Sequence, residues 1–236
     1  MSGEFHTTRW SVVARAGGDG DSARAALTEL CERYWYPVYA FVRRQGEDAE
    51  LARDRTQAFF ARLIEKNVVA EAKPARGRFR SFLLGCLRHD LADQRDRERA
   101  LKRGGGAHVV SIDERDAEGR FAHEPAEATD PEREFERAFA RTLLERVMAG
   151  LREEMEESGK GDAFAALRAH LARSASAAPL RGLAERLGTT EGALKVQLHR
   201  LRRRYAERLR AEIGDIVDRP GDVEDEIRGL FEALSS

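Results

Sequence analysis

Apolar residues recur at intervals of three and four along three segments of the N-terminal part of the chain. These stripes cover residues 27–42, 52–63 and 79–91, with polar residues between the apolar positions. Such spacing places the apolar side chains on one face of an α-helix. Pro37 lies inside the first stripe and predicts a kink or the start of a new helix. The pattern therefore predicts three or four helices that form one N-terminal bundle.

The helical pattern stops at three consecutive glycines, residues 104–106. The stretch that follows is rich in Asp and Glu and poor in apolar residues, which predicts a flexible linker up to about residue 130. Asp130 and Pro131 then predict a new helix, because Asp caps a helix and Pro suits its first turn. Apolar residues continue at helical spacing to Leu151, and residues 158–162 break the pattern.

A short helix, a glycine and a longer basic helix are predicted between residues 180 and 213. Gly188 suits the left-handed position that ends a helix, and Thr189 or Thr190 can cap the next one. This arrangement is typical of the helix-turn-helix unit, whose second helix reads DNA. An ordinary helical hairpin would show the same glycine and leucine spacing, but the basic character of the longer helix favours DNA reading. Its polar residues are Glu191, Lys195, Gln197, His199 and Arg200, followed by Arg202, Arg203 and Arg204.

The last segment of the chain is acidic and carries one apolar stripe. Ile227, Leu230, Phe231 and Leu234 lie three, four and seven residues apart, which predicts an amphipathic helix. We expect this helix to fold back on one of the two helical modules or to bind a partner, and so to modulate DNA access. The alternative is that it only completes the core of the C-terminal module.

Strand-like alternation is missing from the sequence, so the predicted fold class is all-α. Two small helical domains are expected, a bundle and a helix-turn-helix domain, joined by the flexible acidic linker. The predicted boundaries are 1–103 for the bundle, 104–130 for the linker, 131–213 for the helix-turn-helix domain and 214–236 for the acidic extension.

The charges are segregated along the chain although their sum is close to zero. The chain has 41 Lys and Arg against 42 Asp and Glu, a net charge of −1. Basic residues nevertheless gather in two blocks, 76–103 and 181–210, and acidic residues gather in 113–136 and after 213. A polyanion responds to local positive potential, so two basic blocks suit nucleic-acid contact. The alternative is a set of solvated helix faces with internal ion pairs.

Other features of the sequence exclude several classes of protein. No apolar run approaches the ~18 residues of a membrane helix, and the N-terminus lacks the basic and apolar regions of a secretory signal. The two cysteines, Cys31 and Cys86, cannot build a disulfide framework or a metal cluster by themselves, and we expect both to be packing residues. We therefore expect a cytoplasmic protein with no membrane partner.

Four motifs, in this order and with these gaps, resemble one known family. They are Tyr-Trp-Tyr-Pro-Val-Tyr-Ala-Phe at 34–41, the segment from Ala49 to Phe59, Gly-Arg-Phe-Arg-Ser-Phe-Leu-Leu at 77–84, and Leu-Ala-Glu-Arg-Leu-Gly-Thr-Thr-Glu-Gly-Ala-Leu-Lys at 183–195. Together they resemble bacterial RNA polymerase sigma factors of the extracytoplasmic-function type. The residues 8–11 and 222–228 are similar to a subgroup of these factors that carries a C-terminal extension.

The resemblance implies a protein that binds core RNA polymerase and promoter DNA, without catalytic residues, metal or cofactor. Polymerase contacts would be Asp54, Gln57, Phe59 and Arg62, although the helical spacing of Phe59 equally suits a core position. Contacts to the −10 element would be Arg80, Arg88, His89, Arg95, Arg97, Arg99, Lys102 and Arg103. Contacts to the −35 element would be Thr190, Lys195, Val196, His199, Arg200 and Arg203. An anti-sigma factor or another regulator is a further candidate partner.

Two other functions compete with this interpretation. A helix-turn-helix regulator that acts on DNA without joining the polymerase would explain residues 180–210 but not the N-terminal bundle. An enzyme would use His89, Asp90 and Asp93, which lie at helical spacing and could hold a divalent metal. The other histidines offer no convincing additional ligands, so we do not expect an enzyme.

Overall fold

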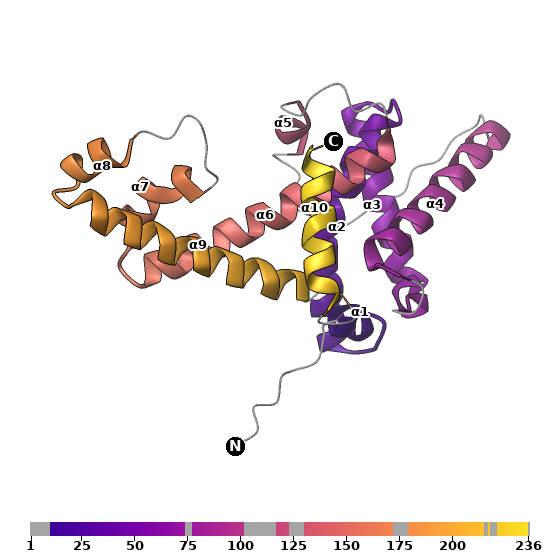
Figure 1. Ribbon diagram of the computed structural model, residues 1–236. Coiled ribbons are helices and arrows are strands. Elements are labelled where there is room, and N and C mark those ends of the chain that lie inside the picture. Colours follow the sequence, from indigo (N-terminus) through magenta and orange to yellow (C-terminus); the bar gives the residue numbers. More distant parts are fainter. Residues whose placement is uncertain are drawn as a thin grey trace, which may run out of the picture. The chain divides into compact units, whose positions relative to one another are not determined.

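The computed structural model describes residues 10–73, 77–101, 117–122, 130–171, 179–214, 217 and 221–235. These residues form ten α-helices and one short 3-10 helix, and none of them lies in a strand (Figure 1). The predicted all-α class is confirmed. Of the helices in these ranges, none combines the length and the apolar character that crossing a bilayer requires.

The chain divides into two compact units, and the boundary between them falls inside one long helix, α6 (Pro131–Glu157). Unit 1 contains residues 1–142 and 213–236, and unit 2 contains residues 143–212. These borders differ from the predicted domain borders, since the start of α6 and the C-terminal segment both belong to unit 1. Each unit is described by itself below.

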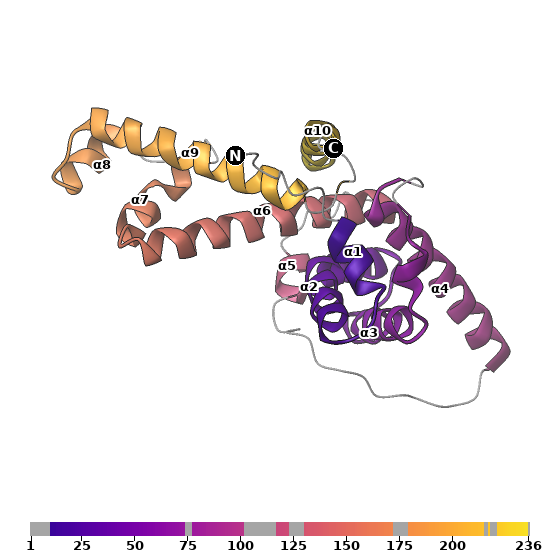
Figure 2. The same ribbon diagram turned by 90° about the horizontal axis from the view of Figure 1, so that it is seen from below.

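Unit 1 is built around α2, which packs against α1, α3 and α5. Its helices are α1 (Trp10–Ala16), α2 (Asp21–Arg44), α3 (Ala49–Glu65), the 3-10 helix η1 (Val68–Glu71), α4 (Phe79–Leu101), α5 (Ala117–Ala122), the start of α6, and α10 (Asp222–Ser235). α2 lies against α1, α3 and α5, and α3 also packs on α4 (Figures 1 and 2).

Local sequence signals explain the helix ends in unit 1. The side chain of Asp48 accepts a hydrogen bond of 2.8 Å from the backbone N–H of Leu51, and it thereby caps α3. Pro37 starts no new helix, because α2 runs through it as one element. That alternative was therefore wrong. Residues 34–42 are buried almost all round, and this packing outweighs the hydrogen bond lost at Pro37.

Aromatic side chains join α2, α4 and α6 in one core. The ring of Tyr34 stacks on that of Phe139 at a centroid distance of 5.2 Å and meets the edge of Phe79 at 5.4 Å. Phe135 and Phe139 have no exposed surface. The first turns of α6 are therefore part of the unit 1 core, although the sequence pattern assigns them to the C-terminal domain.

The predicted linker contains a short helix, α5, which is bound to α2. The Glu118 carboxylate accepts hydrogen bonds from the Tyr39 hydroxyl and from Arg43, the latter at 2.7 and 3.1 Å. The guanidinium groups of Arg43 and Arg44 each lie 4.6 Å from the centre of the Phe121 ring. The hydrogen bonds from Arg43 lower the pKa of Glu118, and burial, followed by the bond to Glu118, raises the pKa of Tyr39 to about 12. Residues 117–122 are thus ordered against α2, while the rest of 104–129 lies outside the described residues.

Unit 2 contains the rest of α6 with α7 (Gly161–Leu171), α8 (Leu180–Arg186) and most of α9 (Glu191–Gly214). The Asp130 side chain accepts a hydrogen bond of 2.9 Å from the N–H of Glu132, so the predicted cap of α6 is confirmed. The core of unit 2 is formed by apolar residues from all four helices. They are Leu151, Met155, Phe164, Leu167, Leu183, Ala184, Leu194 and Leu201.

The shared core of α2, α4 and α6 predicts a large effect of Phe139→Ala. Truncating this buried ring should lower the free energy of unfolding of unit 1 by about 3–5 kcal/mol. Both tryptophans of the chain, Trp10 and Trp35, belong to unit 1, so urea unfolding followed by tryptophan fluorescence reports on this unit. Phe231→Ala is the control, because the Phe231 side chain is 52% exposed and its loss should change the transition by less than about 0.5 kcal/mol. Equal transitions for the two variants would contradict the shared core.

Candidate nucleic-acid interface

The turn between α8 and α9 has the hydrogen bonds of a standard helix C-terminus. The N–H of Thr189 donates to the carbonyl of Ala184 at 3.0 Å, and the N–H of Gly188 donates to that of Glu185 at 3.4 Å. This is the Schellman pattern, which needs a left-handed residue after the helix. Gly188 supplies it with a φ of 62°. The prediction that this glycine ends the first helix is confirmed.

α9 starts at a side-chain cap and has two different faces. The Thr190 hydroxyl accepts a hydrogen bond of 3.1 Å from the N–H of Ala193, so it acts as the predicted cap. Leu194, Leu198 and Leu201 are each at most 5% exposed and form the inner face. All residues of α9 predicted to contact DNA after Thr190 are exposed and share the opposite face. They are Lys195, Val196, His199, Arg200 and Arg203.

The cations on this face are held only by weak, exposed pairs. Lys195 pairs with Glu191 at 2.6 Å and Arg203 with Glu207 at 2.8 Å, each pair one helical turn apart. The hydrogen bond from Lys195 lowers the pKa of Glu191. Exposed pairs of this kind contribute little to stability, so a phosphate can replace the carboxylate at little cost. The face is thus available to a polyanion.

A hollow of about 510 Å³ extends this positive surface. Its lining includes Arg200 and Arg203 of α9, Lys160 from the turn before α7, and the apolar side chains of Met155 and Leu167. Neither Arg200 nor Lys160 pairs with a carboxylate among the residues that the structure describes. Three cations therefore lie near one another beside the outward face of α9, which raises the local positive potential.

Three arginines of α9 hold this helix in unit 2. Arg202 donates a hydrogen bond of 2.8 Å to the carbonyl of His170 in α7. Arg204 pairs with Glu154 of α6 at 2.8 Å, and Arg208 pairs with the same carboxylate at 3.0 Å. Arg202 and Arg204 are therefore bound to neighbouring helices in this structure, whereas Arg203 lies on the outward face.

In unit 1, the middle of α4 presents some of its predicted DNA contacts to solvent. Arg88 is 60% exposed and pairs with Glu132 at 2.8 Å, and His89 is 80% exposed with its Nδ1 3.5 Å from Asp93. Arg95 is half-buried and donates to the side chain of Gln45 at 2.9 Å. The side chains of Arg97 and Arg99, and the residues Lys102 and Arg103, lie outside the described part of the chain.

Arg80 is the predicted DNA contact that the structure places elsewhere. It is 4% exposed, and its guanidinium group pairs with Glu136 of α6 at 2.6 Å and with Glu226 of α10. The ring of Phe139 lies 5.5 Å from the guanidinium carbon. In this conformation Arg80 is therefore covered, and its role as a DNA contact stays a prediction. The sequence gives no sign of the covering, because the carboxylate partners of Arg80 lie far along the chain.

The residues predicted to contact polymerase are divided between the surface and the interior of α3. Asp54 is exposed and Gln57 is half-buried, whereas Phe59 is 3% exposed and belongs to the core. The core alternative for Phe59 is therefore the correct one. Ile64, which is 44% exposed on α3, was not predicted as a surface contact, because a single apolar residue outside the stripe forms no recognisable pattern in the sequence.

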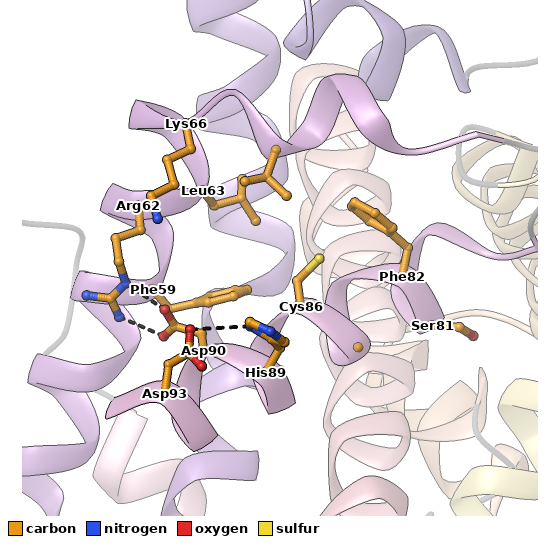
Figure 3. Close-up of a pocket in the computed structure, with 12 residues that line it drawn as sticks. Phe59, Arg62, Leu63, Lys66, Ser81, Phe82, Cys86, His89, Asp90 and Asp93 are labelled. Atoms are coloured by element: carbon orange, nitrogen blue, oxygen red, sulfur yellow. Dashed lines mark hydrogen bonds and ion pairs between the residues drawn. The ribbon is translucent and has the colours of Figure 1, made fainter. Parts of the chain in front are cut away.

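A pocket of about 500 Å³ lies between α3, η1 and α4 (Figure 3). Figure 3 shows Arg62 directed at Asp90, whose carboxylate receives hydrogen bonds of 2.6 Å from both ends of the guanidinium group. Gln94 donates to the same carboxylate at 2.6 Å. Arg62 thus joins α3 to α4, which is a structural role. Burial raises the pKa of the Cys86 thiol in this pocket, so the thiol is a poor nucleophile.

The same contacts bear on the metal site considered for His89, Asp90 and Asp93. The Asp90 carboxylate is already bound by Arg62 and Gln94, so binding a cation there would require breaking three hydrogen bonds. Among the described residues, no group of three or more His, Cys, Asp or Glu is placed to hold a metal ion. The geometry therefore offers this pocket no metal chemistry.

Comparisons of the chain with models of protein families, with curated proteins and with solved structures give no match. The geometry of the two helices and the resemblance of the four motifs are therefore the basis for the function proposed below.

The turn predicts opposite effects of two glycine substitutions. Gly188→Ala should destabilise unit 2 by about 1–2 kcal/mol, because an alanine side chain is strained at positive φ. Gly182→Ala in α8 should stabilise it by about 0.5–1 kcal/mol, because a Cβ there meets nothing within 4 Å and the unfolded chain loses freedom. Thermal unfolding followed by circular dichroism measures both effects. Equal shifts would show that the turn does not need its left-handed residue.

Proposed function

We propose that the protein is a sigma factor of the extracytoplasmic-function type, which binds core RNA polymerase and directs it to promoters. The observation that carries this proposal is the outward face of α9. Five residues with DNA-binding chemistry share that exposed face, the opposite face is buried, and a capped glycine turn precedes the helix. This is the construction of a recognition helix that enters the major groove.

In this proposal the two basic helices bind different parts of a promoter. Lys195, His199 and Arg200 of α9 reach base edges and phosphates of the duplex −35 element, since Arg and Lys pair with guanine and with phosphate oxygens. Arg88 and His89 of α4 contact the −10 element. Two contacts on one DNA strengthen each other, because binding of the first raises the effective concentration of the second.

The polymerase contact is assigned to the outward side of α3. Asp54 and Ile64 are exposed on this helix, and Gln57 is half-buried. Asp54 and Gln57 are two of the residues to which the resemblance assigns polymerase contacts. Phe59 and Arg62 act from inside, since they hold α3 against the core and against α4.

Reconstituted transcription tests the proposal most directly. The purified chain with core polymerase and a promoter library should give transcripts from a subset of promoters. Arg200→Ala should weaken duplex binding by about 1–3 kcal/mol, which is roughly 5–150-fold, and relax the preference at one or two positions. Arg152→Ala is the control, because Arg152 is an exposed arginine on α6 of the same unit. Among the described residues it pairs only with Glu156 of its own helix, and its loss should leave the preference unchanged.

The outcomes of this experiment separate the candidate functions. Sequence-specific binding to duplex DNA without any effect on polymerase would favour a helix-turn-helix regulator. If Arg200→Ala and Arg152→Ala weakened binding equally, the outward face of α9 would not read bases, and the proposal would be wrong.

The polymerase contact predicts a separate effect of Asp54→Arg. Reversing this exposed charge should lower the affinity for core polymerase at least about tenfold, because a misplaced charge at an interface leaves its partner unpaired. Binding of the isolated protein to duplex DNA should be unaffected. Asp19→Arg makes the same charge change at an exposed site outside α3 and serves as the control. Fluorescence anisotropy with labelled protein measures the affinity of each variant for core polymerase. Equal affinities of the two variants would show that this side of α3 is not the polymerase contact.

A further inference from the structure

The acidic C-terminal helix α10 is held in unit 1 by a small contact with an unusual composition. Of its fourteen residues, only Glu226 and Leu230 are buried, at 2% and 3% exposure. Phe231, part of the predicted apolar stripe, is 52% exposed. One of the two buried residues of α10 is therefore a glutamate. The position of α10 depends on the partners of that carboxylate.

Glu226 is paired with the two arginines that flank the first residue of α4. Arg78 Nε lies 2.8 Å from one carboxylate oxygen, and the Arg80 guanidinium group pairs with the other. Gly229, one turn further along α10, passes close to the same groups, since a Cβ built on it would lie 3.7 Å from Arg78 and 3.9 Å from Arg80. Both guanidinium groups thus lie along one side of α10.

The charges in this cluster balance only while α10 is in place. Arg78 and Arg80 supply two positive charges, and Glu136 and Glu226 supply two negative charges. Without α10, Arg80 keeps Glu136, but Arg78, whose side chain is 48% exposed, loses Glu226. Two adjacent cations then face one carboxylate, and this excess of positive charge attracts another anion.

A phosphate is the anion best suited to take the place of this carboxylate. The N–H groups of arginine form the same paired geometry with carboxylate and phosphate oxygens. α4 rises about 1.5 Å per residue, so Arg80 lies about 12 Å along the helix axis from Arg88, an exposed cation of the proposed DNA-binding surface. A nucleic-acid backbone that contacts Arg88 is therefore close enough to reach the start of α4.

We propose that Arg78 and Arg80 form a phosphate-binding site for nucleic acid that α10 occupies through Glu226 in the free protein. DNA and α10 then compete for the same two guanidinium groups, and α10 must leave before the start of α4 joins the DNA contact. The proposal rests on the proposed function, because it assigns a regulator to the same DNA-binding helix. It also explains why a chain with a basic α4 carries an acidic helix against it.

The test compares two variants of the full chain that remove one negative charge from adjacent positions. Glu226→Gln keeps the size of the buried side chain and removes its charge. Asp225→Asn is the matched control, because Asp225 is exposed and, within the described part of the chain, pairs only with Arg228 of its own helix, at 3.1 Å. The probe is a fluorescein-labelled DNA duplex with a single-stranded fork, titrated at several salt concentrations.

Glu226→Gln should bind this DNA at least about fivefold more tightly than the wild-type chain, with Asp225→Asn within about twofold of wild type. The slope of log binding constant against log salt concentration should become steeper by about one to two for Glu226→Gln. Each new phosphate contact adds about 0.9 to the magnitude of this slope. Adding Arg78→Gln to Glu226→Gln should remove most of this gain. Hydrogen exchange of the α10 amides should be faster in Glu226→Gln, and faster in the wild-type chain when DNA is bound.

Leu230→Ala provides a second route that changes no charge. It removes the other buried side chain of α10, so it should also speed exchange in α10 and tighten DNA binding, while circular dichroism verifies that the rest of the chain stays folded. If α10 exchanged faster in these variants but DNA affinity and salt slope were those of wild type, the competition would be refuted. The competition would also be refuted if the α10 amides stayed protected from hydrogen exchange in the DNA complex.

The two proposals fail in different ways in a parallel transcription assay. Promoter-specific transcription that is equal for wild type, Glu226→Gln and Asp225→Asn would leave the proposed function standing and overturn the competition. Tighter DNA binding by Glu226→Gln without any polymerase-dependent transcription would support the competition and overturn the sigma-factor proposal.

Discussion

The burial of Arg80 is the constraint on which the arrangement of unit 1 depends. A guanidinium group that is 4% exposed must be paired, because the cost of removing it from water is several kcal/mol. Its two carboxylate partners come from α6 and α10, so this one side chain requires three helices from distant parts of the sequence to meet at one point. The stacked rings of Tyr34 and Phe139 supply the apolar surroundings that make the burial possible. Unit 1 therefore includes the start of α6 and α10, which the sequence pattern assigns to the C-terminal domain and to a separate extension.

The same physical property, the pairing of arginine, has different consequences in the two units. On α9, Lys195 and Arg203 are paired with exposed carboxylates of their own helix, so these pairs are exchanged for phosphate at little cost. At the start of α4 the pair of Arg80 and Glu226 is buried, so in the proposed competition an incoming anion has to displace α10. In the proposed sigma factor, one DNA-binding surface is thus open in the free protein, and the other is open only in part.

Much of the local structure was predictable because its causes are local. The caps at Asp48, Asp130 and Thr190 and the turn at Gly188 depend on side chains within three residues of the backbone groups they bind. The outward face of α9 followed from the helical period for the same reason. Phe59, in contrast, was ambiguous, because a residue on the border of an apolar stripe suits the core and the surface equally.

The sequence by itself determined most of the helical segments (though not α1 or α5), the ends of several of them, and which residues of α9 face outward. These depend on backbone hydrogen bonds and on a period of 3.6 residues, both of which act over a few positions. Only the tertiary structure decided that α5 and the start of α6 join the N-terminal bundle, that Arg62, Arg202 and Arg204 fasten helices together, and that Glu226 covers the start of α4. Such pairings join charges far apart along the chain, and a charged residue in the sequence looks the same whether its partner is a carboxylate, a phosphate or water.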